Sequence, residues 1–179
     1  MDDVEYIKSK IGTIPNFPKE GVMFRDITTL LKDSIGLKKT IDIFVERYKT
    51  ANFDVVCGIE SRGFVIGSAI AVILGKGFIP IRKKSKLPSK TVSMEYYLEY
   101  GKETIEIHED AIDKGEKVLL VDDLIATGGT FEASVKLIEK VGGKIFECAC
   151  VIDLPELKGS ERIKELGYNV FSILEFEGE

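Results

Sequence analysis

The sequence has no hydrophobic run long enough to cross a membrane. The longest, residues 64–74 (FVIGSAIAVIL), is too short for a spanning helix, which needs about 20 residues, and is expected to form a buried helix. The N-terminal stretch MDDVEYIKSKIG is acidic and has no apolar segment of the kind found in signal peptides. We therefore expect no membrane association and a cytoplasmic location.

Cysteine and histidine are scarce. The three cysteines, Cys57, Cys148 and Cys150, are odd in number and lie in strand-like segments, which argues against a disulfide framework. A Cys-x-Cys pair without a nearby histidine is a poor zinc site, so we expect core thiols in a reducing compartment. The single histidine, His108, lies on an alternating segment, where a surface or hairpin position is expected rather than a catalytic one.

An excess of positive charge is also missing. Lysine and arginine number 25 against 30 acidic residues, a net charge of -5, so the molecule as a whole is not expected to bind nucleic acid. One basic segment exists, RKKSKLPSK at residues 82–90, and it contains no aromatic residue. Readers of single-stranded nucleic acid usually interleave aromatic residues for stacking. The segment therefore suits a phosphate clamp, with a solvated basic loop as the alternative.

Apolar segments alternate in type along the 179 residues, with no repeat and no linker. Helical spacing predicts helices at residues 34–50, 63–75 and 130–141. Short apolar runs predict strands at 54–60, 77–81, 117–121, 144–152 and 169–176. This order predicts one α/β domain with a central, mainly parallel sheet flanked by helices. Residues 92–108 indicate instead a β-hairpin attached to the sheet.

Parallel sheets bind ligands at the carboxyl ends of their strands. The segments that follow the predicted strands should therefore share one edge of the sheet. These are residues 60–63, the chain from Arg82 onward, residues 122–130 and the chain from Asp153 onward.

The stretch VLLVDDLIATGGT, residues 118–130, places two carboxylates and a small, glycine-bearing turn directly after a buried strand. Glycines let backbone N–H groups converge, and the start of the following helix adds positive potential, so the turn suits a phosphate. No lysine follows as in a Walker A loop, which favours a monophosphate. Asp122 and Asp123 can hydrogen-bond vicinal hydroxyls, so a sugar phosphate satisfies both halves. The simpler explanation of the two aspartates is a solvated pair that caps the next helix.

The same stretch resembles the phosphoribosyl-pyrophosphate (PRPP) signature of type I phosphoribosyltransferases. Three further segments resemble adenine phosphoribosyltransferases. They are IPNFPKEGVMFRDITTLL (14–31), GIESRGFVIG (58–67) and IRKKSKLPSKTVSMEYYLEYGKETIEIHEDAI (81–112). The likeness covers nearly the whole chain. It departs at Thr29, where proline is more usual, and at Glu60, where some members have aspartate.

The resemblance implies a type I phosphoribosyltransferase fold with a small N-terminal hood (about residues 1–33) and a flexible β-hairpin flap (about residues 82–108). It implies transfer of a phosphoribosyl group from PRPP to adenine, giving AMP and pyrophosphate, in purine salvage. Mg²⁺ is expected on the oxygens of PRPP, with no direct protein ligand. A homodimer is expected, with basic-loop residues near the partner's site, and a cis Glu60–Ser61 peptide is a further expectation.

The resemblance also implies roles for single residues. The 5′-phosphate is expected on Ala126, Thr127, Gly128, Gly129 and Thr130, and the ribose hydroxyls on Asp122 and Asp123. Pyrophosphate is expected on Ser61, Arg62, Arg82 and Lys86, although Ser61 could also act as a helix cap. Glu99 and Tyr100 are expected to act in the flap, as proton-transfer group and water shield. Adenine is expected near Met23, Arg25 and Leu124, with a position in the core left open as the alternative for Phe24.

Two alternative functions remain open from the sequence. One is a phosphoribosyltransferase for another purine, such as xanthine. The other is a non-enzymatic PRPP-sensing regulator. The hood and the LEYGK flap argue against the first, and the N-terminal residues, which are not basic, argue against the second.

Overall fold

A computed structural model describes residues 1–98 and 101–177. Within this part of the chain the main sheet has seven strands in the order β5-β6-β4-β3-β7-β8-β9. Parallel pairing joins β4 (Gly77–Lys83), β3 (Val55–Ile59), β7 (Lys117–Ile125), β8 (Lys144–Asp153) and β9 (Val170–Glu175). The antiparallel hairpin of β5 (Thr91–Leu98) and β6 (Gly101–His108) is attached to the end of β4. The predicted sheet and hairpin are confirmed.

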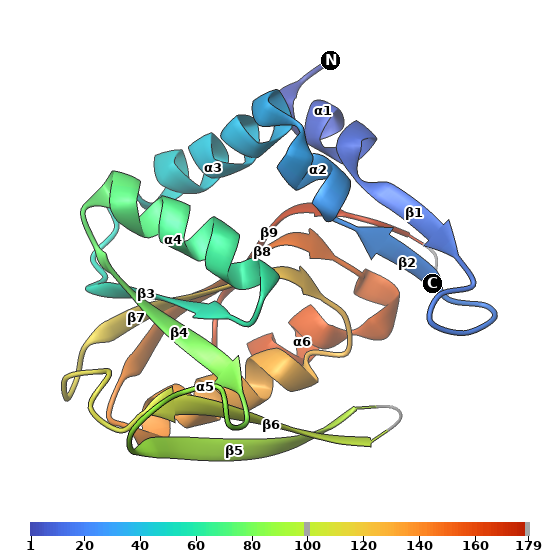
Figure 1. The fold of residues 1–179 in the computed structure, drawn as a ribbon. Coiled ribbons are helices and arrows are strands. Elements are labelled where there is room, and N and C mark those ends of the chain that lie inside the picture. Colours follow the sequence, from blue (N-terminus) through green and yellow to red (C-terminus); the bar gives the residue numbers. More distant parts are fainter. Residues whose placement is uncertain (99–100, 178–179) are drawn as a thin grey trace.

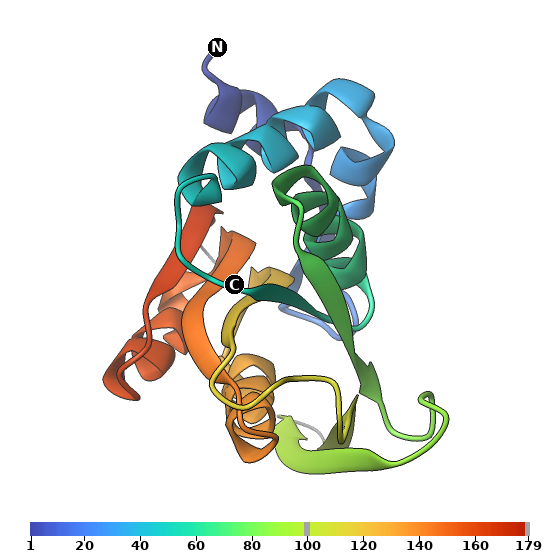
Figure 2. The same cartoon turned by 90° about the vertical axis from the view of Figure 1, so that its left-hand side faces the viewer.

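Helices cover both faces of the sheet, as Figures 1 and 2 show. One face carries α3 (Ser34–Tyr48) and α4 (Arg62–Leu74), and the other carries α5 (Gly129–Lys140) and α6 (Gly159–Glu165). The burial of strand β7 on both of its faces explains this arrangement. Leu119 and Val121 of β7 belong to the core on the α3–α4 side, and Val118 and Leu120 belong to the core on the α5 side, all fully buried. A strand buried on both faces needs a helical layer on each of them.

The N-terminal residues form a small separate layer with α1 (Asp3–Lys10), α2 (Thr28–Lys32) and the antiparallel pair β1 (Gly12–Pro15) and β2 (Met23–Asp26). Thr29 joins these parts, because its hydroxyl accepts from the backbone N–H of Gly12 (2.9 Å) and donates to the carbonyl of Lys10 (2.7 Å). The layer lies against the end of β9 (Figure 1). There Lys8 Nζ donates to the carbonyl of Glu175 at 2.8 Å.

Strand β7 is longer than predicted. It continues to Ile125 and so contains Asp122 and Asp123 rather than ending before them. The reason is that β8 keeps pairing with β7 as far as Ile125↔Asp153, whereas β3 pairs with it only as far as Gly58↔Val121. The strand therefore carries the two aspartates past the point where its other neighbour ends.

The three cysteines and the single histidine lie where they were expected. All three cysteines are buried and free, and His108 is the last residue of the hairpin strand β6.

In the residues that the structure describes, no helix is both long and apolar enough to cross a membrane.

Candidate active site

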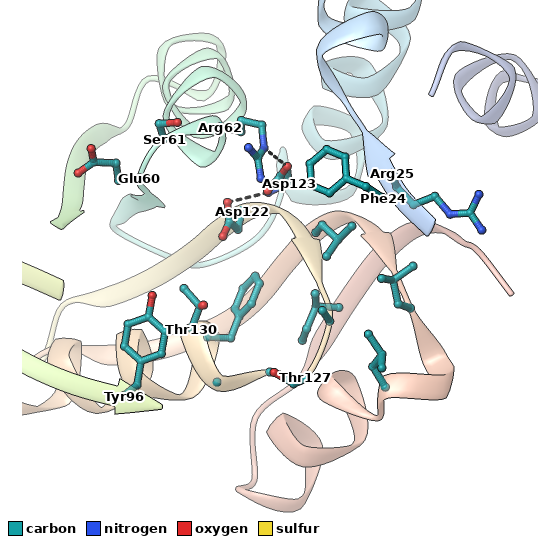
Figure 3. Close-up of a pocket in the computed structure, with 18 of the residues that line it drawn as sticks. Phe24, Arg25, Glu60, Ser61, Arg62, Tyr96, Asp122, Asp123, Thr127 and Thr130 are labelled. Atoms are coloured by element: carbon teal, nitrogen blue, oxygen red, sulfur yellow. Dashed lines mark hydrogen bonds and ion pairs between the residues drawn. The ribbon is translucent and has the colours of Figure 1, made fainter. Parts of the chain in front are cut away.

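A cavity of about 680 Å³ opens at the carboxyl ends of β3, β4 and β7 (Figure 3). It is lined from five directions: the hood strand β2, the β3–α4 turn, the end of β4, the flap strand β5, and the β7–α5 turn with the segment after β8. Its described lining residues are Val22 to Arg25, Glu60 to Arg62, Lys83, Tyr96, Asp122 to Phe131, Leu154 and Leu157. The predicted meeting of the strand-end segments at one edge is confirmed.

The β7–α5 turn forms a cup, defined here as residues 126–130. Gly128 caps α5 in the left-handed conformation (φ 79°), which favours glycine. The solvated-cap explanation for the aspartates is therefore wrong, since Gly128 occupies the N-cap position. Backbone N–H groups at the start of α5 are thus left available to an anion in the cavity.

Gly159, at the start of α6, supports the cup from behind. A Cβ atom on Gly159 would lie 2.1 Å from the carbonyl oxygen of Ala126 and 2.6 Å from the nitrogen of Gly128. The backbones of the two segments can approach this closely only because position 159 has no side chain. No sequence motif pointed to Gly159, because its partner lies about 30 residues earlier in the chain.

The two aspartates are buried and close to one another. Asp122 Oδ1 accepts from the backbone N–H of Asp123 at 2.9 Å, and Asp123 Oδ2 pairs with Arg62 Nε. Burial, with the neighbouring charge of Asp123, holds the pKa of Asp122 well above its ordinary value. The unliganded cavity therefore contains one carboxyl that resists ionisation and one that is paired with an arginine.

Arg62 was predicted to bind pyrophosphate, and the structure places its guanidinium on Asp123, a residue predicted to bind ribose (Figure 3). The Glu60–Ser61 peptide before it is cis, as expected. Ser61 occupies the N-cap position of α4, but its side chain makes no capping hydrogen bond. The capping alternative for the Ser61 hydroxyl is therefore wrong.

Glu60 connects the β3–α4 turn with the basic segment. Its carboxylate accepts from the backbone N–H of Lys83 at 2.8 Å and from Arg82 Nε at 3.3 Å. Arg82 also donates to the carbonyl of Lys86 at 3.0 Å, and the Lys86 side chain is exposed. The described contribution of the basic segment to the cavity is Lys83. No sequence pattern separates Lys83 from its charged neighbours, because the choice depends on how Glu60 folds the loop.

The hood side of the cavity has an apolar character. Met23 and Leu124, which were predicted to lie near adenine, line it. Phe24, for which a core position was the open alternative, also lines it (Figure 3). Its ring is edge-on to Phe17 at a centroid distance of 5.1 Å. A flat apolar wall of this kind suits the face of an aromatic ring.

Arg25 borders the cavity but directs its guanidinium away from the centre (Figure 3). It donates to Thr13 Oγ1 at 2.7 Å and to the carbonyl of Glu177 at 3.3 Å, and it lies 4.4 Å from the centre of the Phe176 ring. These contacts tie β2 to the C-terminal segment, so this structure shows Arg25 positioning the strand that carries Met23 and Phe24.

The flap contributes Tyr96 of β5 to the cavity, a residue not assigned from the sequence. Glu99 and Tyr100, the predicted flap residues, lie outside the described residues.

A buried carboxylate pair beside an anion cup, at the edge of a parallel sheet, defines the site of a protein that binds a sugar phosphate. Comparison with known proteins agrees. The phosphoribosyl transferase domain family matches residues 26–178. The adenine phosphoribosyltransferase of Nitrosomonas europaea is 57% identical over 171 residues, which is 96% of this chain and 98% of that protein.

Solved structures give the same result. The adenine phosphoribosyltransferase of Thermoanaerobacter pseudethanolicus has a TM-score of 0.91 and 44% identity, covering 97% of this chain and 99% of that one. The Saccharomyces cerevisiae enzyme, complexed with adenine and an imino-altritol bisphosphate, has a TM-score of 0.89 and 36% identity, covering 96% and 98%. The chain belongs to the phosphoribosyltransferase family, and within it to the adenine phosphoribosyltransferases.

Proposed function

We propose that this protein transfers the 5-phosphoribosyl group of PRPP to adenine, releasing AMP and pyrophosphate, as a purine-salvage enzyme. The observation that carries the proposal is the cavity itself, in which a phosphate cup, two carboxylates and an apolar hood wall face one another. The yeast relative, solved with adenine, supports the choice of base.

In the proposed complex, the cup residues Ala126 to Thr130 hold the 5′-phosphate at the N-terminus of α5. Asp122 and Asp123 accept hydrogen bonds from the ribose hydroxyls. Such bonds stabilise the ionised carboxylates that burial disfavours, so binding the sugar relieves part of the cost of the unliganded site.

Pyrophosphate leaves toward the β3–α4 turn, where Ser61 and Arg62 receive it, with Arg82 and Lys86 from the basic segment and Lys83 beside them. Arg62 must first leave Asp123. The ribose hydroxyls replace Arg62 on this carboxylate, so sugar binding releases the arginine for the leaving group. The positive charges then stabilise pyrophosphate as the bond to the sugar carbon breaks.

Magnesium enters as part of the substrate. Among the described residues, no group of three or more histidine, cysteine, aspartate or glutamate side chains could hold a metal. Mg²⁺ keeps several waters and prefers substrate phosphate oxygens, so it would arrive on PRPP and lie near the two carboxylates of the cavity without being held by them directly. Mg²⁺ would reduce the charge repulsion between the substrate phosphates and these carboxylates.

Adenine lies between Leu124 on β7 and the hood residues Met23 and Phe24. Backbone groups around Met23 contact its edge, and Arg25 holds β2 in place. Glu99 exchanges a proton with the base, and Tyr100 helps to exclude water, so that the sugar carbon meets the base nitrogen and not solvent.

We also propose a homodimer in the cytoplasm. Helix α4 leaves a large part of three apolar side chains exposed, Val65 (45%), Val72 (78%) and Ile73 (58%), and burying such a patch favours association. The resemblance to the family implies that a second copy would bring its basic segment toward this site. Buried free thiols suit the reducing cytoplasm, and a sizing measurement tests the dimer.

The decisive experiment measures pyrophosphate release from Mg-PRPP in the presence of adenine, hypoxanthine, guanine or xanthine. We expect release with adenine only, and its loss in an Asp122→Asn/Asp123→Asn variant that remains folded. Folded wild-type protein that releases no pyrophosphate would contradict the proposal, and preference for xanthine would overturn the choice of base.

A further inference from the structure

Tyr96 occupies a position in the flap that faces the cup. It belongs to β5, which is the edge strand of the main sheet and pairs with β6 alone. Side chains alternate along the strand: Tyr96 is half-buried and lines the cavity, whereas Tyr97 is 74% exposed. The outer part of β5 therefore lies over the site with one aromatic ring inward and one outward.

The contact between β5 and the cup is direct. A Cβ atom on Gly129 would lie 3.8 Å from Tyr96 Cδ2 and 3.5 Å from the carbonyl oxygen of Tyr97. At its other end the Tyr96 ring brings its hydroxyl to the Thr130 side chain, with which it interacts (Figure 3). Thr130 is itself a cup residue, so the Tyr96 hydroxyl lies at the rim of the space proposed for the 5′-phosphate.

The hydroxyl is kept protonated at this place. Burial raises the pKa of Tyr96, and the charges of Glu103 and Asp122 raise it further against the opposing contact with Thr130. Glu103 is the cross-strand neighbour of Tyr96 on β6, and Asp122 of β7 lines the same cavity. A protonated phenol beside a helix N-terminus is a hydrogen-bond donor to an anion in the cup.

We propose that Tyr96 belongs to the 5′-phosphate site, donating a hydrogen bond from the flap to the phosphate, so that an occupied cup holds β5 over the cavity. The inference rests on the proposed function, because it requires a sugar phosphate in the cup.

Two ligands, each corresponding to one part of PRPP, can test this proposal. Ribose 5-phosphate occupies the cup, whereas pyrophosphate occupies the β3–α4 turn and leaves the cup empty. The chain contains no tryptophan, so Tyr97→Trp introduces a single fluorescent reporter on the exposed side of β5. Both dissociation constants are then measured in this reporter protein with and without Tyr96→Phe. Tyr168→Phe, which removes a hydroxyl bonded to Glu139 away from the cavity, is the matched control.

We expect Tyr96→Phe to weaken ribose 5-phosphate binding about ten- to a hundredfold, the usual loss for a hydrogen bond to a charged group, and to leave pyrophosphate binding unchanged. Tyr168→Phe should change neither. Unchanged ribose 5-phosphate binding in Tyr96→Phe, or equal weakening of both ligands, would overturn the inference. If the reporter protein with Tyr96 intact fails to bind ribose 5-phosphate, the proposed function itself fails, and the two failures are thereby distinguished.

Discussion

Replacing Gly159 by alanine should impair PRPP binding, although Gly159 belongs to α6 and not to the cup. Two effects of the added methyl group oppose one another. In a helix interior alanine is a better helix former than glycine by about 0.8–1.0 kcal/mol, and this is the upper limit of the gain at Gly159, the first residue of α6. The added Cβ, however, would lie 2.1 Å from the carbonyl oxygen of Ala126 and 2.6 Å from the nitrogen of Gly128. Both are backbone atoms, so the contact cannot be relieved by turning a side chain.

The steric effect should prevail. Overpacking costs about 1–3 kcal/mol, and so severe a contact belongs near the upper end, which leaves a net loss of about 2 kcal/mol after the helix gain. In a domain of this size that loss lowers Tm by roughly 4–8 °C. The displaced cup should also lose activity, since a misplacement of about 1 Å can cost about a hundredfold. We expect a decrease of that order in kcat/KM for PRPP, with the KM for adenine little changed.

Thermal unfolding and initial rates at varied PRPP and varied adenine measure these effects. Gly77→Ala is the matched control, because its added Cβ would meet only Val55 Cγ2, at 3.5 Å. If Gly159→Ala has the same Tm and the same PRPP kinetics as the wild type, both the steric conflict and the support of the cup by Gly159 are refuted. A lower Tm with unchanged PRPP kinetics would show that Gly159 stabilises the fold without shaping the cup.

Three further substitutions test the site. Glu99→Gln should lower turnover by about 10²–10⁴ while keeping PRPP binding, and unchanged turnover would remove Glu99 from the mechanism. Asp122→Asn should change the pH dependence of unfolding. The pKa of Asp122 is raised in the folded protein, so the stability that this carboxyl contributes is fully present below pH 3.8, its ordinary pKa. That stability is lost as the pH rises through the raised pKa. The unliganded variant should therefore gain stability relative to wild type as the pH rises, and denaturant unfolding curves that shift equally with pH in both proteins would contradict this. Asp123→Asn should free Arg62 and tighten pyrophosphate binding severalfold in calorimetric titration without a ribose ligand, and weaker binding would argue against the proposed exchange.

Much of the fold could be predicted because its signals are local. The periodicity of residues 34–50 and 130–141, and the apolar runs of the parallel strands, depend on neighbours within a few positions. The cup is equally local, since glycines and hydroxyls at the end of a strand suffice to indicate it. The length of β7 was predicted less well, because a partner strand, β8, determines how far pairing continues.

The parts of the site that could not be predicted depend on contacts between distant segments. Gly159 supports the cup from α6. Arg25 was assigned to the base, but Phe176 and Glu177, about 150 residues later, hold its guanidinium. Residue type indicates that an arginine will bind something polar or aromatic, yet which partner it meets is decided by the packing of the whole chain.

The charges of the unliganded site show how contacts between distant segments affect function. Sequence reasoning assigns Arg62 to pyrophosphate and Asp123 to ribose as independent binding groups, whereas the structure pairs them with one another. A charge buried without a partner is costly, so the buried Asp123 carboxylate needs Arg62 as a partner before substrate arrives, whereas the Arg62 side chain is 46% exposed and keeps contact with solvent. PRPP carries both replacements in one molecule, hydroxyls for the aspartate and phosphates for the arginine. Pyrophosphate alone would draw Arg62 away and leave the buried Asp123 carboxylate without a partner, and the pairing therefore favours the complete substrate over pyrophosphate alone.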